Sequence, residues 1–123
     1  MCKLVEIKVG DKKIKVANIK QKYMGNIADA AKDCDYIDRI VVFGSSIQTR
    51  CKEDSDIDLA VFGNVSKGKC LTSKKYEDFL KKVVSFDDFN QGYDILYFKT
   101  GQRNLNAIMD DIENGELLYE SKR

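Results

Sequence analysis

Two short polar runs carry most of the chemistry that this sequence could perform. Gly44-Ser45-Ser46 ends one apolar run, and Asp56-x-Asp58 opens another. Glycine permits a tight turn and a close approach of the backbone to a ligand. Serine hydroxyls and the free N–H groups of a helix that begins here suit an anion such as phosphate. Paired carboxylates supply the oxygen ligands that Mg²⁺ prefers. The two runs together therefore predict phosphoryl or nucleotidyl transfer.

Strands must position these residues. The apolar runs 39–43 and 57–62 are short and rich in β-branched residues, as is typical of buried strands. Side chains alternate along a strand, so Asp56 and Asp58 share one face and Ile57, Leu59 and Val61 take the other. Two carboxylates on one face are costly unless they are solvated, paired or bound to a metal.

A third carboxylate, Asp94, lies near the start of a further apolar run, 93–98. A carboxylate on an apolar strand has two readings. It is either solvated at the start of the strand or it faces a metal ion. We favour the second, because the Asp56 and Asp58 pair calls for another oxygen donor.

Gly44-Ser45, a spacer of ten residues and Asp56-x-Asp58 together resemble the signature of the nucleotidyltransferase superfamily that includes DNA polymerase β. The chain looks most like the small bacterial minimal nucleotidyltransferases, over about residues 37–119. The resemblance implies two Mg²⁺ ions bound by Asp56, Asp58 and Asp94, the residues that would also be catalytic. It implies ATP or another nucleoside triphosphate as substrate, with its phosphates held at Gly44, Ser45 and Ser46.

The acceptor is open from sequence. Small proteins of this type often modify a hydroxyl side chain of a helical toxin-like partner, so the resemblance implies AMP transfer to such a partner. The alternative is a non-catalytic member that serves as a binding module or antitoxin. An RNA-binding adaptor is a weaker alternative, because the formal net charge is only +1 and no concentrated basic groove is evident. The same balance argues against a nucleic-acid acceptor.

Composition excludes several other functions. The chain has no histidine, which rules out Ser-His-Asp and Cys-His catalysis and leaves a carboxylate, a lysine or a metal-bound hydroxide as general base. The four cysteines are widely spaced, and we expect them to be reduced thiols. With no apolar run of membrane-spanning length and no signal-peptide pattern, we expect a cytoplasmic protein with no membrane partner.

The rest of the chain predicts the scaffold. Residues 1–17 read as a β-hairpin with a turn at 10–12, and a helix capped by Asn18 should run to about Asp33. We also expect a short helix over 46–50, a flexible loop over 63–71, a helix capped by Thr72 or Ser73, and a solvated turn at 86–92. Arg50 and Lys52 should be basic loop residues near the phosphates. A last helix is marked by Leu105, Ile108, Met109 and Ile112 and should stop at Gly115.

These elements predict an α/β (α+β) fold: a small mixed sheet flanked by helices, the polymerase β-like nucleotidyltransferase core, with the N-terminal hairpin in front. With 123 residues, we expect one domain over 1–123.

Overall fold

The computed structural model describes residues 2–103 and 107–122. Within these residues, four strands form a mixed sheet in the order β5-β4-β3-β6, and two more form a separate antiparallel hairpin, β1-β2. Strand β4 runs parallel to β5, whereas β3 is antiparallel to both β4 and β6. The elements in chain order are β1 Leu4–Val9, β2 Lys12–Ala17, a 3₁₀ helix Asn18–Lys20, α1 Gln21–Lys32, β3 Ile37–Phe43, a 3₁₀ helix Gly44–Ile47, β4 Ile57–Gly63, α2 Lys67–Leu71, α3 Lys74–Ser85, β5 Tyr93–Lys99, α4 Ile108–Glu113 and β6 Glu116–Glu120.

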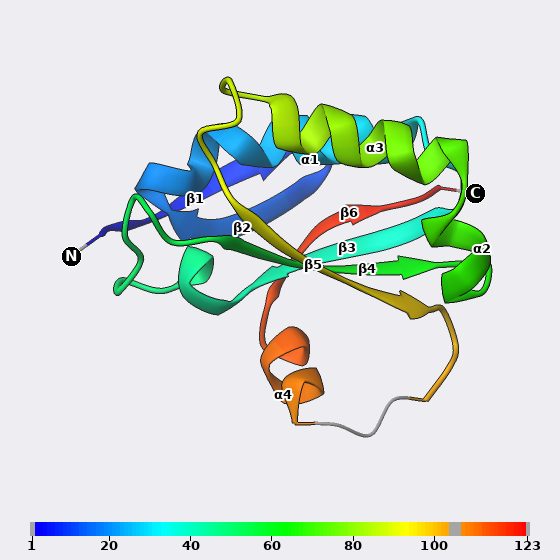
Figure 1. Cartoon of the computed structure of the whole chain (residues 1–123). Helices are drawn as coiled ribbons and strands as arrows, with labels where there is room; N and C mark the ends of the chain where they lie inside the picture. The colour runs from blue at the N-terminus through cyan, green and yellow to red at the C-terminus, as the bar shows by residue number, and fades with distance from the viewer. Residues whose placement is uncertain (1, 104–106, 123) are drawn as a thin grey trace.

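The sheet has two unequal faces. Figure 1 shows α1 and α3 lying along one face and α4 on the other. The hairpin contacts α1 and β6. This arrangement confirms the predicted α+β class with a mixed sheet, flanking helices and an N-terminal hairpin. No helix in the described part of the chain is long and apolar enough to span a bilayer.

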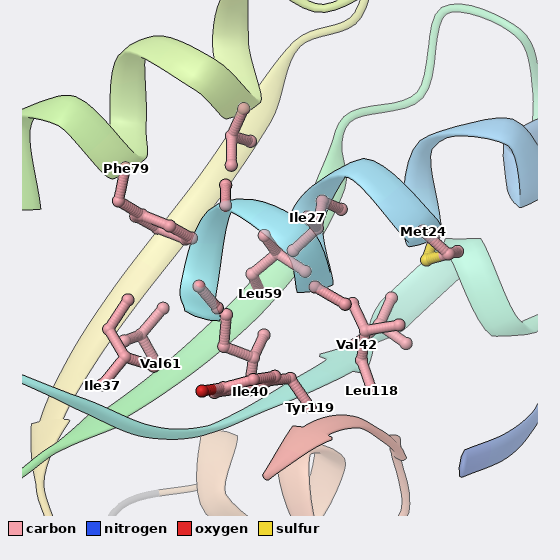
Figure 2. Close-up of a cluster of buried hydrophobic side chains, with 14 of the residues drawn as sticks. Met24, Ile27, Ile37, Ile40, Val42, Leu59, Val61, Phe79, Leu118 and Tyr119 are labelled. Carbon is pink, nitrogen blue, oxygen red and sulfur yellow. The ribbon is translucent and has the colours of Figure 1, made fainter. Parts of the chain in front are cut away.

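The larger core fills the space between the sheet and the helices α1 and α3 (Figure 2). Its fully buried side chains come from every layer, including Met24 and Ile27 of α1, Leu59 of β4 and Phe79 of α3. A smaller cluster lies on the face that carries α4. It comprises Val41, Phe43, Ala60, Phe62 and Ile112, with Leu96, Phe98, Met109 and Leu117 packed against it.

The helix that follows the hairpin begins differently from the prediction. Asn18 does not cap α1; its side-chain oxygen accepts the Lys3 N–H at 3.3 Å and ties the start of β1 to the end of β2. A 3₁₀ turn intervenes, and α1 begins at Gln21 with no side-chain cap. By contrast, Ser73 caps α3 as predicted, because its hydroxyl accepts the Tyr76 N–H at 3.2 Å.

Two segments differ from the predicted loop and the predicted short helix. The segment expected to be a flexible loop over 63–71 includes α2, which Ser66 caps by accepting the Lys69 N–H. The short helix expected over 46–50 is instead the 3₁₀ helix Gly44–Ile47, so it begins at the glycine itself. Polar and glycine-rich composition had suggested a loop at α2, whereas one capping serine suffices for a single helical turn.

The last helix, α4, contains Ile108, Met109 and Ile112 of the predicted apolar stripe. Leu105, the first residue of that stripe, lies outside the described residues. Gly115 follows the helix as predicted, for a different reason. A Cβ on Gly115 would lie 2.6 Å from the Val42 carbonyl oxygen, so the residue is small because β6 crosses close to β3.

Candidate functional site

Strand register brings two of the predicted acids side by side. Asp58 and Asp94 are direct partners in the parallel β4–β5 ladder, and Asp58 also pairs with Phe43 at the end of β3. Asp56 comes one residue before β4. Because side chains alternate, all three carboxylates belong to the face that carries α4. Asp56 and Asp94 are exposed, and Asp58 is partly buried.

Gly44 makes room for one of these carboxylates. It has a left-handed backbone (φ +71°), and a Cβ added there would collide with the Asp58 carboxylate. Gly92 makes room for Asp56 in the same way, because a Cβ on Gly92 would collide with the Oδ1 atom of Asp56. The first residue after β3 and the residue before β5 therefore both lack a Cβ, so that the acids can occupy the space.

The acids affect each other electrostatically. Burial raises the pKa of the Asp58 carboxyl, and the negative charges of Asp94 and Asp56 raise it further. The Arg50 guanidinium opposes this shift, so its charge is felt at the site. Arg50 is exposed and donates a hydrogen bond to the Gln48 side chain. Like charges held together in this way favour a bound cation.

The two serines of the turn differ. Ser45 is partly exposed, and its carbonyl accepts the Gln48 N–H at 3.0 Å. Ser46 is fully buried, and its hydroxyl has no partner among the described residues. A ligand at the sheet edge could reach the Ser45 hydroxyl, whereas the Ser46 side chain points into the protein.

The nearby thiol is not activated. Burial raises the pKa of Cys51, although Lys20 and the Ser45 hydroxyl lower it in part. A raised pKa leaves little thiolate at neutral pH, which argues against a nucleophilic role. All four cysteines fall in the described part of the chain, and all are free thiols.

The donor set suits Mg²⁺ chemically, because Asp56, Asp58 and Asp94 offer only carboxylate oxygens on one face. In the described residues, however, no three acidic or thiol side chains converge closely enough to hold a metal ion as they stand. The acids thus offer the kind of oxygen that a magnesium site uses, from three positions on one face of the sheet.

A buried lysine beside the site was missed by sequence reasoning. Lys20 is 1% exposed, and its ammonium donates to the carbonyls of Glu53 and Ser55 and to the side chain of Gln91. A signal was present in the sequence: Lys20 stands four residues before Met24, in step with the apolar stripe of α1. A lysine in that position has to find acceptors in the interior.

The turn before β5 is largely exposed, as predicted, but Asp87 within it is anchored to α1. Asp87 accepts a hydrogen bond from the Tyr23 hydroxyl at 2.7 Å and forms an ion pair with Lys22 at 3.2 Å. Asp87, Asp88 and Phe89 all have positive φ. A left-handed run of three non-glycine residues needs such anchoring, because each costs energy.

Comparison with known families gives a match over most of the chain. Residues 25–123 match the family described as "Polymerase beta, Nucleotidyltransferase", a range that begins within α1 and includes every predicted site residue. No curated protein matches the chain.

Proposed function

Because the chain belongs to the polymerase beta nucleotidyltransferase family, we propose that it transfers a nucleoside monophosphate, with AMP from ATP the first candidate, to a hydroxyl acceptor. Asp56, Asp58 and Asp94 carry the reaction, and the turn at Gly44 and Ser45 receives the phosphates. One observation carries the proposal: the Asp58 carboxylate, in register with Asp94, lies against Gly44, which has no Cβ to displace it.

The transfer balances as follows. The acceptor oxygen forms a bond to the α-phosphorus, the bond between that phosphorus and the bridging oxygen breaks, and pyrophosphate leaves with the electron pair. The acceptor proton needs a base, and the chain has no histidine. We assign the role of general base to Asp94, because it is the exposed carboxylate in register with Asp58.

Asp56, Asp58 and Asp94 would also hold two Mg²⁺ ions. When bound, the ions would offset charge on the triphosphate and lower the pKa of the acceptor hydroxyl. The raised pKa of Asp58 supports this role, because a carboxylate crowded by like charges gains most from a cation. Arg50 adds positive charge at the same edge, where it can pair with phosphate oxygens.

The proposed acceptor is a protein. Asp56 and Asp94 are exposed on the face that carries the short helix α4, so a partner protein can approach them there. A cognate helical toxin-like partner, as the resemblance implies, would bring its own hydroxyl to this face. A cytoplasmic location, where ATP is available, is part of the same proposal.

Two labels test the reaction. The protein is incubated with Mg²⁺, the product of the neighbouring gene and ATP labelled at either the α- or the γ-phosphate. We expect protein labelling from α-labelled ATP alone, since γ-label would leave in pyrophosphate. Asp58→Asn should abolish the label and Asp111→Asn, an exposed acid on α4, should keep it. Label from the γ-phosphate would indicate a kinase and overturn the proposal.

A second candidate is a binding module that retains the fold without catalysis. The absence of three converging acids in the described residues favours it. It predicts ATP binding with no transfer of the α-label to any acceptor, including RNA. Labelled RNA with unlabelled protein would keep nucleotidyl transfer and refute the protein acceptor.

A further inference from the structure

Lys20 is buried more completely than its charge would suggest. It is 1% exposed, although lysine is almost never fully buried unless it is paired. Its ammonium donates to the Glu53 carbonyl at 2.9 Å, the Ser55 carbonyl at 2.7 Å and Gln91 Oε1 at 2.7 Å. These bonds use the three donors of an ammonium group and offset the cost of its desolvation.

Gln91 extends the network to the next strand. It is 5% exposed, and its amide donates to the Ser55 carbonyl at 2.9 Å and to the Gly92 carbonyl at 2.7 Å. The Gly92 carbonyl also accepts the Ile57 N–H at 3.1 Å. Lys20 and Gln91 therefore share the Ser55 carbonyl, and together they join the chain entering β4 to the chain entering β5.

The joined segments are those that carry the acids. Asp56 follows Ser55 directly, and its carboxylate lies against Gly92. Asp94 comes two residues after Gly92, in register with Asp58. A change in the spacing between these two segments would therefore change the spacing between carboxylates on β4 and β5.

The electrostatic environment agrees with this geometry. Burial lowers the pKa of Lys20, whereas the nearby Cys51, Asp56 and Asp54 side chains raise it in part. The ammonium is thus close enough to Asp56 to interact with its charge.

We propose that Lys20 and Gln91 are positioning residues of the acid site, which hold the entries to β4 and β5 at the separation that the proposed transfer reaction requires. The effect on transfer rests on the proposed function; the effect on the backbone does not. A purely structural role would predict instead that their loss weakens the whole fold evenly.

Hydrogen exchange distinguishes the two roles without using activity. We compare Lys20→Met and Gln91→Met with Val83→Ala, a cavity-forming change in the core helix α3 away from the site. The reporters are the Ile57 N–H, bonded to the Gly92 carbonyl, and the Ser55 N–H, bonded to the Lys52 carbonyl. We expect both to exchange at least tenfold faster in the two methionine variants, relative to amides of the β3–β4 ladder. Val83→Ala should accelerate the amides without this local excess.

Transfer kinetics give the second measurement. We expect kcat to fall at least tenfold in both methionine variants while KM for ATP changes less than threefold, and we expect Val83→Ala to keep both constants. Gln91→Met keeps the test valid if Lys20→Met fails to fold. Uniform exchange across the ladder and the reporters would overturn the proposal, and so would locally faster exchange with an unchanged kcat. If the wild type transfers nothing, the proposed function fails and the exchange comparison alone decides the positioning role.

Discussion

The two faces of β4 differ in what their side chains do. Ile57, Leu59 and Val61 face α1 and α3 and are fully buried. Asp58 points to the opposite face, between the Gly44 turn and Asp94, where it is partly exposed. Adjacent residues on one strand thus have different roles, one in the core and one in the acid site, because their side chains point to opposite faces of the sheet.

The two faces also differ in free energy. Burial of Leu59 removes apolar surface from water and stabilises the fold. Burial of Asp58 near two other carboxylates disfavours its charged form, as its raised pKa indicates. Repulsion between carboxylates on the acid face therefore destabilises the fold, and burial of apolar side chains on the core face offsets that cost. Substitutions on the two faces should separate activity from stability.

The largest effect is expected on the acid face. Asp58→Asn should reduce nucleotidyl transfer about a thousandfold, because it removes a charged oxygen where transition-state charge must be balanced. The thermal midpoint should not fall. The measurement is the initial rate of α-label transfer beside a melting curve, with Asp111→Asn as the matched acid-to-amide control. Transfer at the wild-type rate in Asp58→Asn would remove this residue from the reaction.

The neighbouring residue should behave in the opposite way. Leu59→Ala leaves a cavity beneath α1 and α3 and should lower the free energy of unfolding by about 2–5 kcal/mol. Rate per folded molecule should stay within a few-fold of wild type. Urea denaturation and the same transfer assay check both parts. If Leu59→Ala lost activity as fully as Asp58→Asn while still folded, the two faces would not be separable.

A substitution at Gly44 should affect both ligand binding and the stability of the fold. Gly44→Ala places a Cβ against the Asp58 carboxylate and also forces alanine into a left-handed backbone. Gly10→Ala is a matched control, with φ +61° and no atom within 4 Å of its added Cβ. Both should lose about 1–2 kcal/mol of stability from the backbone. Affinity for Mg–ATP should fall about tenfold in Gly44→Ala alone. Equal losses of affinity would refute the close contact with Asp58.

The smallest effect concerns pH. The pKa of Asp58 is raised in the folded state, so its contribution to stability is present below its unfolded value of about 3.8 and is lost as pH rises through the raised value. At pH 7 Asp58→Asn should therefore melt slightly above wild type. The difference should shrink to zero as the pH falls toward 3.8. A wild type that melts above the variant at pH 7 would show that the carboxylate is stabilised, not strained.

Much of this arrangement was predictable from the sequence. Alternation placed Asp58 opposite Leu59, and the apolar runs located the strands β3, β4 and β5 to within a few residues. These predictions rest on patterns within one strand, where the physics is local. The Asp58–Asp94 register was not predictable in that way, because it depends on how two strands separated by α3 align.

The network around Lys20 shows where sequence reasoning stops. Its acceptors are backbone carbonyls at Glu53 and Ser55, and every residue has a carbonyl, so composition carries no trace of them. The fully buried Ser46 is a similar case, since a serine beside Ser45 looked equally accessible in the sequence. Both depend on how the turns fold back on the sheet.

Calorimetric titration with ATP, with and without Mg²⁺, tests the central claim most directly. It compares the wild type with Asp58→Asn, and Asp111→Asn serves as control. The account predicts that the wild type and Asp111→Asn bind ATP only with Mg²⁺ and that Asp58→Asn binds at least tenfold more weakly. Binding by Asp58→Asn with wild-type affinity would contradict it, because the nucleotide would then lie away from the acid face.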